Sequence, residues 1–446
     1  MKKNVKAVPE NLKRSVIYQL FLRAFTVEGT LEAAEKKLPD IKALGFDIVY
    51  LCPICTEDDD MDKAYWSPRQ KETGFGNPKN PYRIKDYFNI DEEYGTDEDF
   101  KHFVNAAHSL GLKIMFDLVY MHCGPKAVFL AEHPNFVQRY ENGEILYGKD
   151  FALSLINFED QKLCEYLWDN MVYWVKEFDV DCYRCDVGDA VPLDFWQEGF
   201  KRVKDIKSDF IMLNEGVKGD YLVGENSFNI NYCVQWCATL SWVLRKQHDK
   251  TAKDLRICEK GSQMFPAGGR GISTLDNHDT ANESYNSRID SAVGSDGMEA
   301  ALALNYLIDG VPFIYNGNEI CDTNRHSIFS NRFFSQFIID WAKKDTDDAK
   351  NRMAFIKKMN KLRQENAFLF DGETTWVDND CPDTILTFTR TLGDKKWFVL
   401  VNLSSDKQNV NTKFDKPLNN KILCKNVYKT ENEFIAEPYG YIVYDF

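Results

Sequence analysis

The sequence predicts an α/β fold, a (β/α)8 TIM barrel followed by a small antiparallel β-sandwich. Four apolar, β-prone runs alternate with segments of helix length, and each run ends in polar side chains. This pattern is typical of the active-site face of a parallel barrel. After about residue 366, short β-rich runs separated by turn residues replace the alternation. We therefore expect residues 1–365 to form the barrel and residues 366–446 the sandwich.

Eight short apolar segments are expected to supply the barrel strands, and most are followed by a segment long enough for a helix. Helices are expected at Leu31–Leu44, Asp97–Leu110, Gln161–Glu177 and Lys350–Arg363, the second of them capped by Thr96. The expected strands, in chain order, are Val16–Leu22, Phe46–Leu51, Lys113–Val119, Val180–Cys185, Phe210–Asn214, Phe228–Tyr232, Ile272–Leu275 and Pro312–Tyr315.

The segment between the second and third expected strands, residues 52–86, is long and rich in Gly, Pro, Trp and Tyr. It has no convincing period, so we expect a loop over the active-site face. Its acidic run, Glu57 to Asp60, is interpreted as a solvated part of that loop, because charge runs usually face water.

One run, VDCYRCDVGDAVP at 180–192, places Arg184 and Asp186 two residues apart at the end of a β-prone segment. In a strand, residues i and i+2 point to the same face. A guanidinium beside a carboxylate favours the ionised carboxylate. An ionised, positioned Asp is what a covalent nucleophile requires.

Polar side chains follow three other apolar runs in the same way. Glu215 ends one run, His278 and Asp279 end another, and Asp117 and His122 lie on and just beyond a third. The carboxyl ends of parallel barrel strands meet at one face of the barrel. We therefore expect these side chains to converge.

Four motifs occur in order along the chain: DLVYMH (117–122), DCYRCD (181–186), the strand-end glutamate at 215, and TLDNHD (274–279). They resemble the motifs of the α-amylase superfamily, glycoside hydrolase family 13, which read D-x-V-x-N-H, G-F-R-x-D, Glu and F-x-x-N-H-D. Met121 replaces Asn, and Tyr183 stands for Phe. The order and spacing agree over nearly the whole chain. The resemblance also implies a short B-domain insertion after the third strand, at about residues 123–158.

The resemblance implies a role for each of three acids. Asp186 would be the nucleophile, Glu215 the proton donor, and Asp279 the acid that grips sugar hydroxyls as the ring flattens. Glu215 must hold a proton near neutral pH, and negative charge from the other two acids would favour that state.

Four further residues are expected to bind substrate. Arg184 would hold Asp186 in its charged form, His122 and His278 would donate hydrogen bonds to sugar hydroxyls, and Tyr82 matches the aromatic residue that stacks on the reacting sugar. Asp117 is interpreted as structural, bracing the arginine or a neighbouring loop.

Some aromatic residues of the long loop leave two interpretations open. Tyr65 and Trp66 could line outer sugar sites, or they could pack within the loop.

Composition argues against nucleic acids and membranes as partners. A net charge of −14 disfavours a nucleic-acid groove and an anionic membrane surface. No apolar run is long enough to cross a membrane, and the basic start lacks the apolar core of a signal peptide. A cytoplasmic protein is therefore expected.

Twelve cysteines are spread along the chain, and they are expected to be buried free thiols in a reducing compartment. Cys182 and Cys185 have C-x-x-C spacing, but in a strand they would face opposite sides and could not hold one zinc ion. No metal site is expected.

Calcium is possible but not expected. Related amylases often use the Asn that Met121 replaces as a ligand, and a thioether binds that hard cation poorly. We therefore expect no cofactor.

Together these features predict a retaining hydrolase of α-glucosidic bonds in maltooligosaccharides or starch fragments, acting through a covalent glycosyl-enzyme intermediate. A transglycosylase or sugar isomerase of the same family, trehalose-forming or sucrose-cleaving, is the main alternative. A non-catalytic sugar-binding relative is a weaker one. Linkage preference, endo or exo action and oligomeric state are left open by the motifs.

Overall fold

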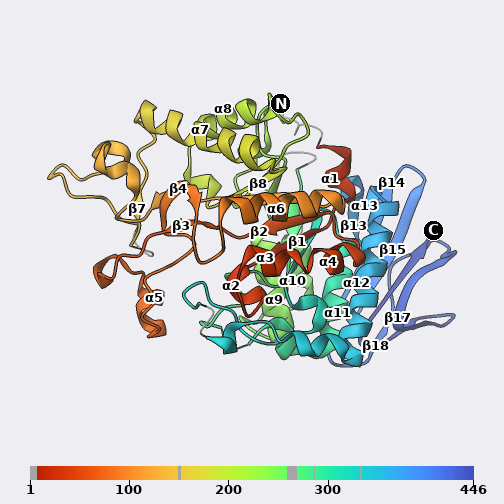
Figure 1. Ribbon diagram of the computed structural model, residues 1–446. Coiled ribbons are helices and arrows are strands. Elements are labelled where there is room, and N and C mark those ends of the chain that lie inside the picture. Colours follow the sequence, from red (N-terminus) through yellow and green to blue (C-terminus); the bar gives the residue numbers. More distant parts are fainter. Residues whose placement is uncertain (1–7, 149–151, 259–268, 286, 332–333) are drawn as a thin grey trace.

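The computed structural model describes residues 8–148, 152–258, 269–285, 287–331 and 334–446. The basic start (1–7) and part of the expected insertion (149–151) lie outside the described residues. Eight parallel strands close a barrel in the order β1-β12-β11-β10-β9-β8-β5-β2, which confirms the expected fold. These strands are β1 (Ile17–Leu20), β2 (Ile48–Leu51), β5 (Lys113–Leu118), β8 (Cys182–Cys185), β9 (Ile211–Asn214), β10 (Ile230–Tyr232), β11 (Gly271–Ser273) and β12 (Val311–Tyr315). Figure 1 labels β1, β2 and β8 of this barrel.

Strand periodicity divides the buried side chains into an inner and an outer core. In β8, Cys182 belongs to the cluster inside the barrel, whereas Tyr183 and Cys185 belong to the cluster between barrel and helices. The two cysteines of the C-x-x-C pair therefore face opposite sides, as predicted. Among the described residues no disulfide bond forms.

Helices cover the outside of the barrel. The helix expected at Leu31–Leu44 is instead two short helices, α3 (Leu31–Glu35) and α4 (Leu38–Ala43). Pro39 lies in the first turn of α4, where its missing N–H is tolerated, and it disfavours helical geometry just before it. Besides α5 (Pro68–Thr73), the other α-helices of the described residues are α1 (Glu10–Arg14), α2 (Leu22–Phe25), α6 (Asp97–Ser109), α7 (Gln161–Phe178), α8 (Leu193–Lys204), α9 (Val234–Arg245), α10 (Ala252–Cys258), α11 (Ile289–Leu307), α12 (Asp347–Glu365) and α13 (Phe368–Asp371).

The segment between β2 and β5 is more ordered than the loop that we expect from its composition. It contains an antiparallel pair, β3 (Cys55–Glu57) with β4 (Ile84–Ile90), and a helix, α5 (Pro68–Thr73). Pro68 and the left-handed Gly74 mark the two ends of α5. The prediction of a featureless loop is therefore wrong in this region.

The interpretation of the acidic run as solvated is wrong at Glu57 and Asp58, which are both buried. Glu57 accepts a hydrogen bond from Arg23 at 2.7 Å, and Asp58 lies 3.3 Å from a nitrogen of Arg83. Asp58 also accepts a hydrogen bond from the backbone N–H of Lys126 at 2.6 Å. These buried acids fasten the β2–β5 segment to the barrel and to the segment after β5.

The segment after β5 carries little regular structure. It contains a two-residue pair, β6 (His122–Cys123) with β7 (Ser154–Leu155), and the short 3-10 helices η2 (Val128–Ala131) and η3 (Pro134–Phe136). Gly124 approaches Asp58 so closely that an added Cβ would lie 2.5 Å from that carboxylate. A glycine is therefore needed where the two segments meet.

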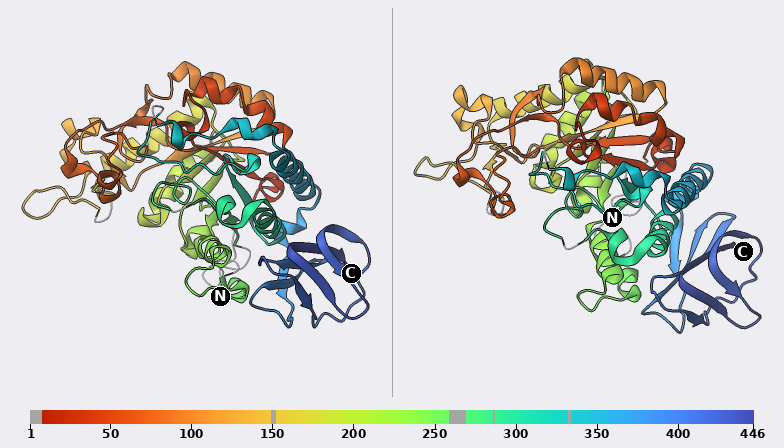
Figure 2. Two further views of the ribbon diagram at one scale, coloured as in Figure 1. Left: turned by 90° about the horizontal axis from the view of Figure 1, so that it is seen from below. Right: turned by 60° about the horizontal axis from the view of Figure 1, so that its bottom comes forward.

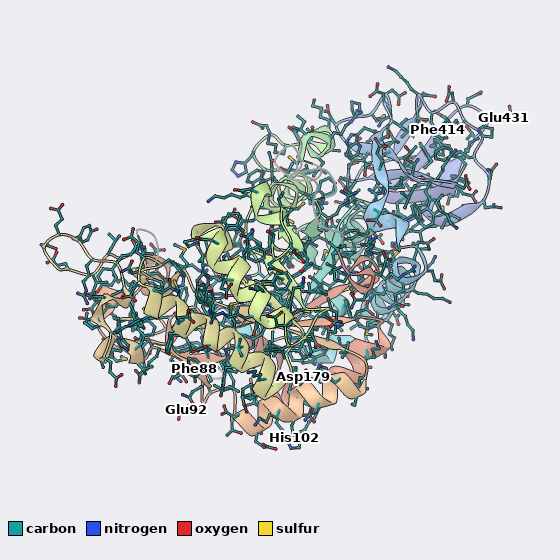
Figure 3. The ribbon with its side chains drawn as sticks, turned by 90° about the horizontal axis from the view of Figure 1, so that it is seen from above. Phe88, Glu92, His102, Asp179, Phe414 and Glu431 are labelled. Atoms are coloured by element: carbon teal, nitrogen blue, oxygen red, sulfur yellow. The ribbon has the colours of Figure 1, made fainter. Side chains whose placement is uncertain are left out.

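Antiparallel strands form the C-terminal part of the chain, as expected. They surround a core of their own, and Figures 1 and 2 show them on the side of the barrel away from β3, β4 and α5. In Figure 3, Phe414 and Glu431 mark this part, far from Phe88 and Glu92. The strands are β13 (Glu373–Trp376), β14 (Ile385–Leu392), β15 (Lys395–Asn402), β16 (Gln408–Val410), β17 (Lys421–Lys429) and β18 (Phe434–Asp445).

No helix in the described part of the chain combines the length and apolar character needed to cross a membrane.

Candidate active site

The predicted site residues converge at the carboxyl ends of neighbouring strands. Register pairs Asp117 on β5 with Arg184 on β8, and Arg184 in turn with Leu213 on β9. Asp186 and Glu215 come directly after β8 and β9. Parallel register therefore brings three acids and a basic residue, from three of the motifs, to one face of the barrel.

Arg184 is the centre of this arrangement. Its Nη1 donates to both oxygens of Asp117, at 2.8 and 3.0 Å, and to Oδ1 of Asp186 at 2.8 Å. Its Nη2 lies 2.7 Å from Oε2 of Glu215. The interpretation of Asp117 as a brace for the arginine is confirmed. The guanidinium is buried, so these carboxylates hold it with little competition from water.

One guanidinium shared by three carboxyl groups differs from the simple pair that we expect from the sequence. Burial raises the pKa of the Asp186 carboxyl well above its usual range, Arg184 opposes that rise, and Glu215 and Asp117 add to it. Three ionised acids around one cation would leave two uncompensated negative charges. This repulsion and the burial favour the protonated form of Asp186, against the expectation that Arg184 keeps this carboxyl charged.

Glu215 is the more accessible of the two acids, with 24% of its side chain exposed. Its Oε2 also accepts the backbone N–H of Val187 at 2.9 Å. Val187 has a φ of +41°, which is an unusual backbone conformation for a β-branched residue. The residue that donates to Glu215 is therefore strained.

The turn that follows Glu215 is fixed by Asp189. Its Oδ2 accepts the N–H groups of Val217 and Lys218, at 2.6 and 2.9 Å. A Cβ added to Gly216 would lie 2.2 Å from this carboxylate, so only glycine fits.

Tyr82 and His278 are held by a chain of hydrogen bonds. The amide nitrogen of Gln19 donates to Nδ1 of His278 at 2.7 Å, so the ring carries its proton on Nε2, 2.6 Å from the Tyr82 hydroxyl. Tyr82 donates to Asp117 at 3.1 Å. The two rings stack, with centroids 5.2 Å apart and planes at 14°. His278 therefore donates its Nε2 proton in a hydrogen bond to Tyr82 within the protein. The sequence predicts that this histidine would donate to a sugar hydroxyl instead.

His122 and Asp279 flank the central acids. Nε2 of His122 lies 3.7 Å from Oδ2 of Asp186, and burial lowers the pKa of this histidine to about 4. Asp279 has 48% of its side chain exposed and lies 3.4 Å from Nε2 of His278. A neutral imidazole and an open carboxylate suit hydrogen bonding to hydroxyl groups.

Two cavities meet at these acids. One, of about 280 Å³, is lined by Asp186 and by Tyr82, His122 and His278. The other, of about 330 Å³, has more apolar walls. Glu215 and Asp279 line both. The second cavity is also lined by Tyr232, Val234, Trp242, Leu275 and Tyr285.

Trp66 does not line either cavity. It is buried, and its Nε1 donates to the carbonyl of Asp60 at 2.9 Å, so the packing interpretation is confirmed for this residue. Three residues of the site were not predicted: Gln19, Tyr50, which donates to Asp117 at 2.6 Å, and Arg69, which lines the first cavity. A polar Gln19 inside an apolar strand was a usable signal, because buried polar side chains need partners. Arg69 lies in a segment without periodicity and gave no such signal.

Within the described residues, no group of three or more His, Cys, Asp or Glu side chains is placed to hold a metal ion.

Replacing His122 with Gln should flatten the pH dependence of stability. The folded-state pKa of about 4 lies below the ordinary value of 6.5, so the unfolded chain binds this proton first and stability falls as the pH drops from about 6.5 to about 4. Between pH 7 and pH 5, wild type should lose about 2 kcal/mol more unfolding free energy than His122→Gln in urea titrations. His102→Gln, at a side chain 70% exposed, is the control and should follow wild type. Equal losses in wild type and His122→Gln would refute the assignment.

Comparisons with known proteins find relatives of this chain in sequence and in fold. The family model for the alpha-amylase catalytic domain matches residues 9–151 and 137–366. The intracellular maltogenic amylase of Bacillus subtilis (strain 168) is 25% identical over 430 residues, which cover 89% of this chain and 65% of that protein. The maltogenic alpha-amylase of Bacillus acidopullulyticus is 25% identical over 429 residues, which cover 87% and 65%.

Among solved structures, that of the maltogenic alpha-amylase AmyB from Thermotoga neapolitana has a TM-score of 0.80 at 25% identity and covers 98% of this chain and 99% of its own. The chain thus spans a little under two thirds of the length of the two curated relatives. With a barrel whose strand ends carry the four motifs, and a family model that matches most of its length, the chain belongs to the α-amylase superfamily.

Proposed function

We propose that the protein is a retaining hydrolase of α-glucosidic bonds in maltooligosaccharides or starch fragments. The observation that carries the proposal is the Asp186–Glu215 pair, bound to the two terminal nitrogens of one buried guanidinium. Two carboxyl groups that share one proton can act as nucleophile and as acid in the same step. The names of the similar proteins, which are maltogenic amylases, support the substrate class.

The geometry suits a double displacement. An oxygen of Asp186 would form a bond to C1 as the glycosidic C–O bond breaks, and the proton of Glu215 would pass to the leaving oxygen. Glu215, then a carboxylate, would take a proton from water as that water attacks C1 and releases Asp186. Retaining enzymes hold these two groups about 5–5.5 Å apart, too close for a water between them, and a shared guanidinium keeps them close.

Transfer to a second sugar is the other candidate, and one observation favours it. The cavity on the far side of Glu215 is largely apolar and includes the rings of Trp242 and Tyr285. A sugar that stacks there would displace water from the intermediate. Products from maltotriose, isomaltose, sucrose and trehalose separate the candidates, and NMR of the first-formed sugar tests retention. An initially β-configured product from an α-glucoside would exclude the mechanism.

We also propose a cytoplasmic location. The name of one similar protein, an intracellular enzyme, and the absence of disulfide bonds among the described residues support it.

Replacing Asp186 with Asn should lower kcat at least about 10⁴-fold while leaving the fold intact, because the amide cannot form the glycosyl ester. A fluorinated glucosyl substrate that traps the intermediate should label Asp186 in wild type, as read by peptide mass spectrometry. Asp279→Asn is the matched control, since it should still become labelled at Asp186. A label on Asp279 in wild type would overturn the assignment.

Replacing Glu215 with Gln should affect substrates unequally. An activated aryl leaving group needs no proton, so the first step on an aryl α-glucoside should be nearly retained, whereas cleavage of maltotriose should fall about 10²–10⁴-fold. Burst kinetics measure the first step directly. Equal loss on both substrates would argue against Glu215 as the acid.

We propose that no metal is required. The carboxylate of Asp58 already binds Arg83 and a backbone N–H, and Glu57 binds Arg23, so these acids do not offer free oxygens to a cation. Excess EDTA should change neither the melting temperature nor the rate. A loss of both that calcium restores would reveal a site.

A further inference from the structure

The cavity that contains Asp186 and Tyr82 is bounded on one side by an ion pair. Nε of Arg69, in α5, lies 2.8 Å from Oε1 of Glu283, and Nη2 lies 3.3 Å from Oε2. The two side chains are 29% and 12% exposed. This two-pronged contact joins the segment after β2 to the loop after β11, and Arg69 itself lines the cavity.

Neighbouring contacts make this boundary a fixed wall. The guanidinium of Arg69 lies 5.0 Å from the ring centre of Phe329, which also lines the cavity. The side-chain amide of Asn77 donates to the carbonyls of Phe329 and Ser330, at 3.2 Å each. Arg325 donates to the carbonyl of Glu283 at 3.1 Å. Segments after β2, β11 and β12 are thereby held together at one place.

The two acids indicate which end of the substrate meets this wall. Asp186 lines only the cavity that contains Arg69, whereas Glu215 also lines the cavity with Trp242 and Tyr285. A proton donor must face the leaving oxygen, so the leaving part of the chain extends toward Trp242. The attacked sugar then lies beside Tyr82, and its non-reducing side points toward Arg69 and Glu283.

We infer that the Arg69–Glu283 ion pair closes the donor side of the site, so that the enzyme cuts short products from non-reducing chain ends and does not cut inside long chains. The inference rests on the proposed function and specifies its substrate. A cavity of about 280 Å³ lies at the lower limit of ligand pockets and suits one or two sugar rings. A chain that continued past them would have to separate a partly buried bidentate ion pair.

The test compares maltoheptaose with maltoheptaose carrying a 4,6-benzylidene block on its non-reducing end. Products are separated by chromatography, and an aryl α-glucoside and an aryl α-maltoside report the chemistry itself. Wild type should cut the blocked heptasaccharide at least about 100-fold more slowly than the free one, because the cavity has no room for the blocked end. From free maltoheptaose, wild type should release mainly glucose or maltose.

The variant Arg69→Ala/Glu283→Ala should raise the blocked-to-free rate ratio at least about tenfold and lengthen the first products. Glu283→Gln keeps the size of the side chain and removes one charge, so it should shift the ratio in the same direction by less. The swap Arg69→Glu/Glu283→Arg should move the ratio back toward wild type. The control is Arg202→Ala/Glu165→Ala, which removes an ion pair of 2.8 Å between α8 and α7 and should leave the ratio unchanged.

Two results would overturn the inference alone. Wild type could cut both heptasaccharides at similar rates, or both Arg69→Ala/Glu283→Ala and Glu283→Gln could keep the wild-type ratio while hydrolysing the aryl glycosides. If wild type hydrolysed none of these substrates, the proposed function would fail and this inference with it.

Discussion

The guanidinium of Arg184 is the interaction on which the rest of the site depends. Three carboxyl groups from three strand ends approach one another because this cation lies between them. A buried charge is tolerated only where it is fully paired, so the barrel interior must supply these acids in fixed positions. The three acids differ in their other surroundings. Asp117 is buried against two tyrosine hydroxyls, Asp186 is buried at the cavity wall, and Glu215 is partly open.

Around this centre, polar side chains of the barrel hold the aromatic wall in place. Gln19 on β1 orients His278, and His278 orients Tyr82, which arrives from the β2–β5 segment. A hydrogen-bonded chain of this kind fixes both the tautomer of the imidazole and the plane of the ring. The cavity is therefore preorganised, and a bound sugar would not have to order its walls.

The barrel could be predicted because each strand is buried on both faces and therefore appears in the sequence as a short continuous apolar run. The positions of Arg184, Asp186 and Glu215 could be predicted because Arg184 lies within such a strand and the two acids follow one directly. Asp279 lies in the loop after β11 and was identified by its motif. Segments without a period could not be predicted, since distant partners decide their structure. Glu57 belongs to a charge run of the kind that usually faces water, whereas in the fold it is buried beside Arg23. The sharing of Arg184 among three acids likewise depends on strand register, which no local pattern contains.

Closure of the barrel has a consequence for synthesis of the chain. One edge of β1, the first barrel strand, pairs with β12, the last barrel strand, with Ile17 opposite Phe313. The other edge of β1 pairs with β2. On the ribosome, roughly 300 residues must be added before that first edge finds its partner, which takes on the order of tens of seconds. Throughout this time an apolar strand edge stays open to other chains. The protein is therefore most prone to aggregate while only its N-terminal half has been synthesised, and this is the period in which holding chaperones would have to protect it.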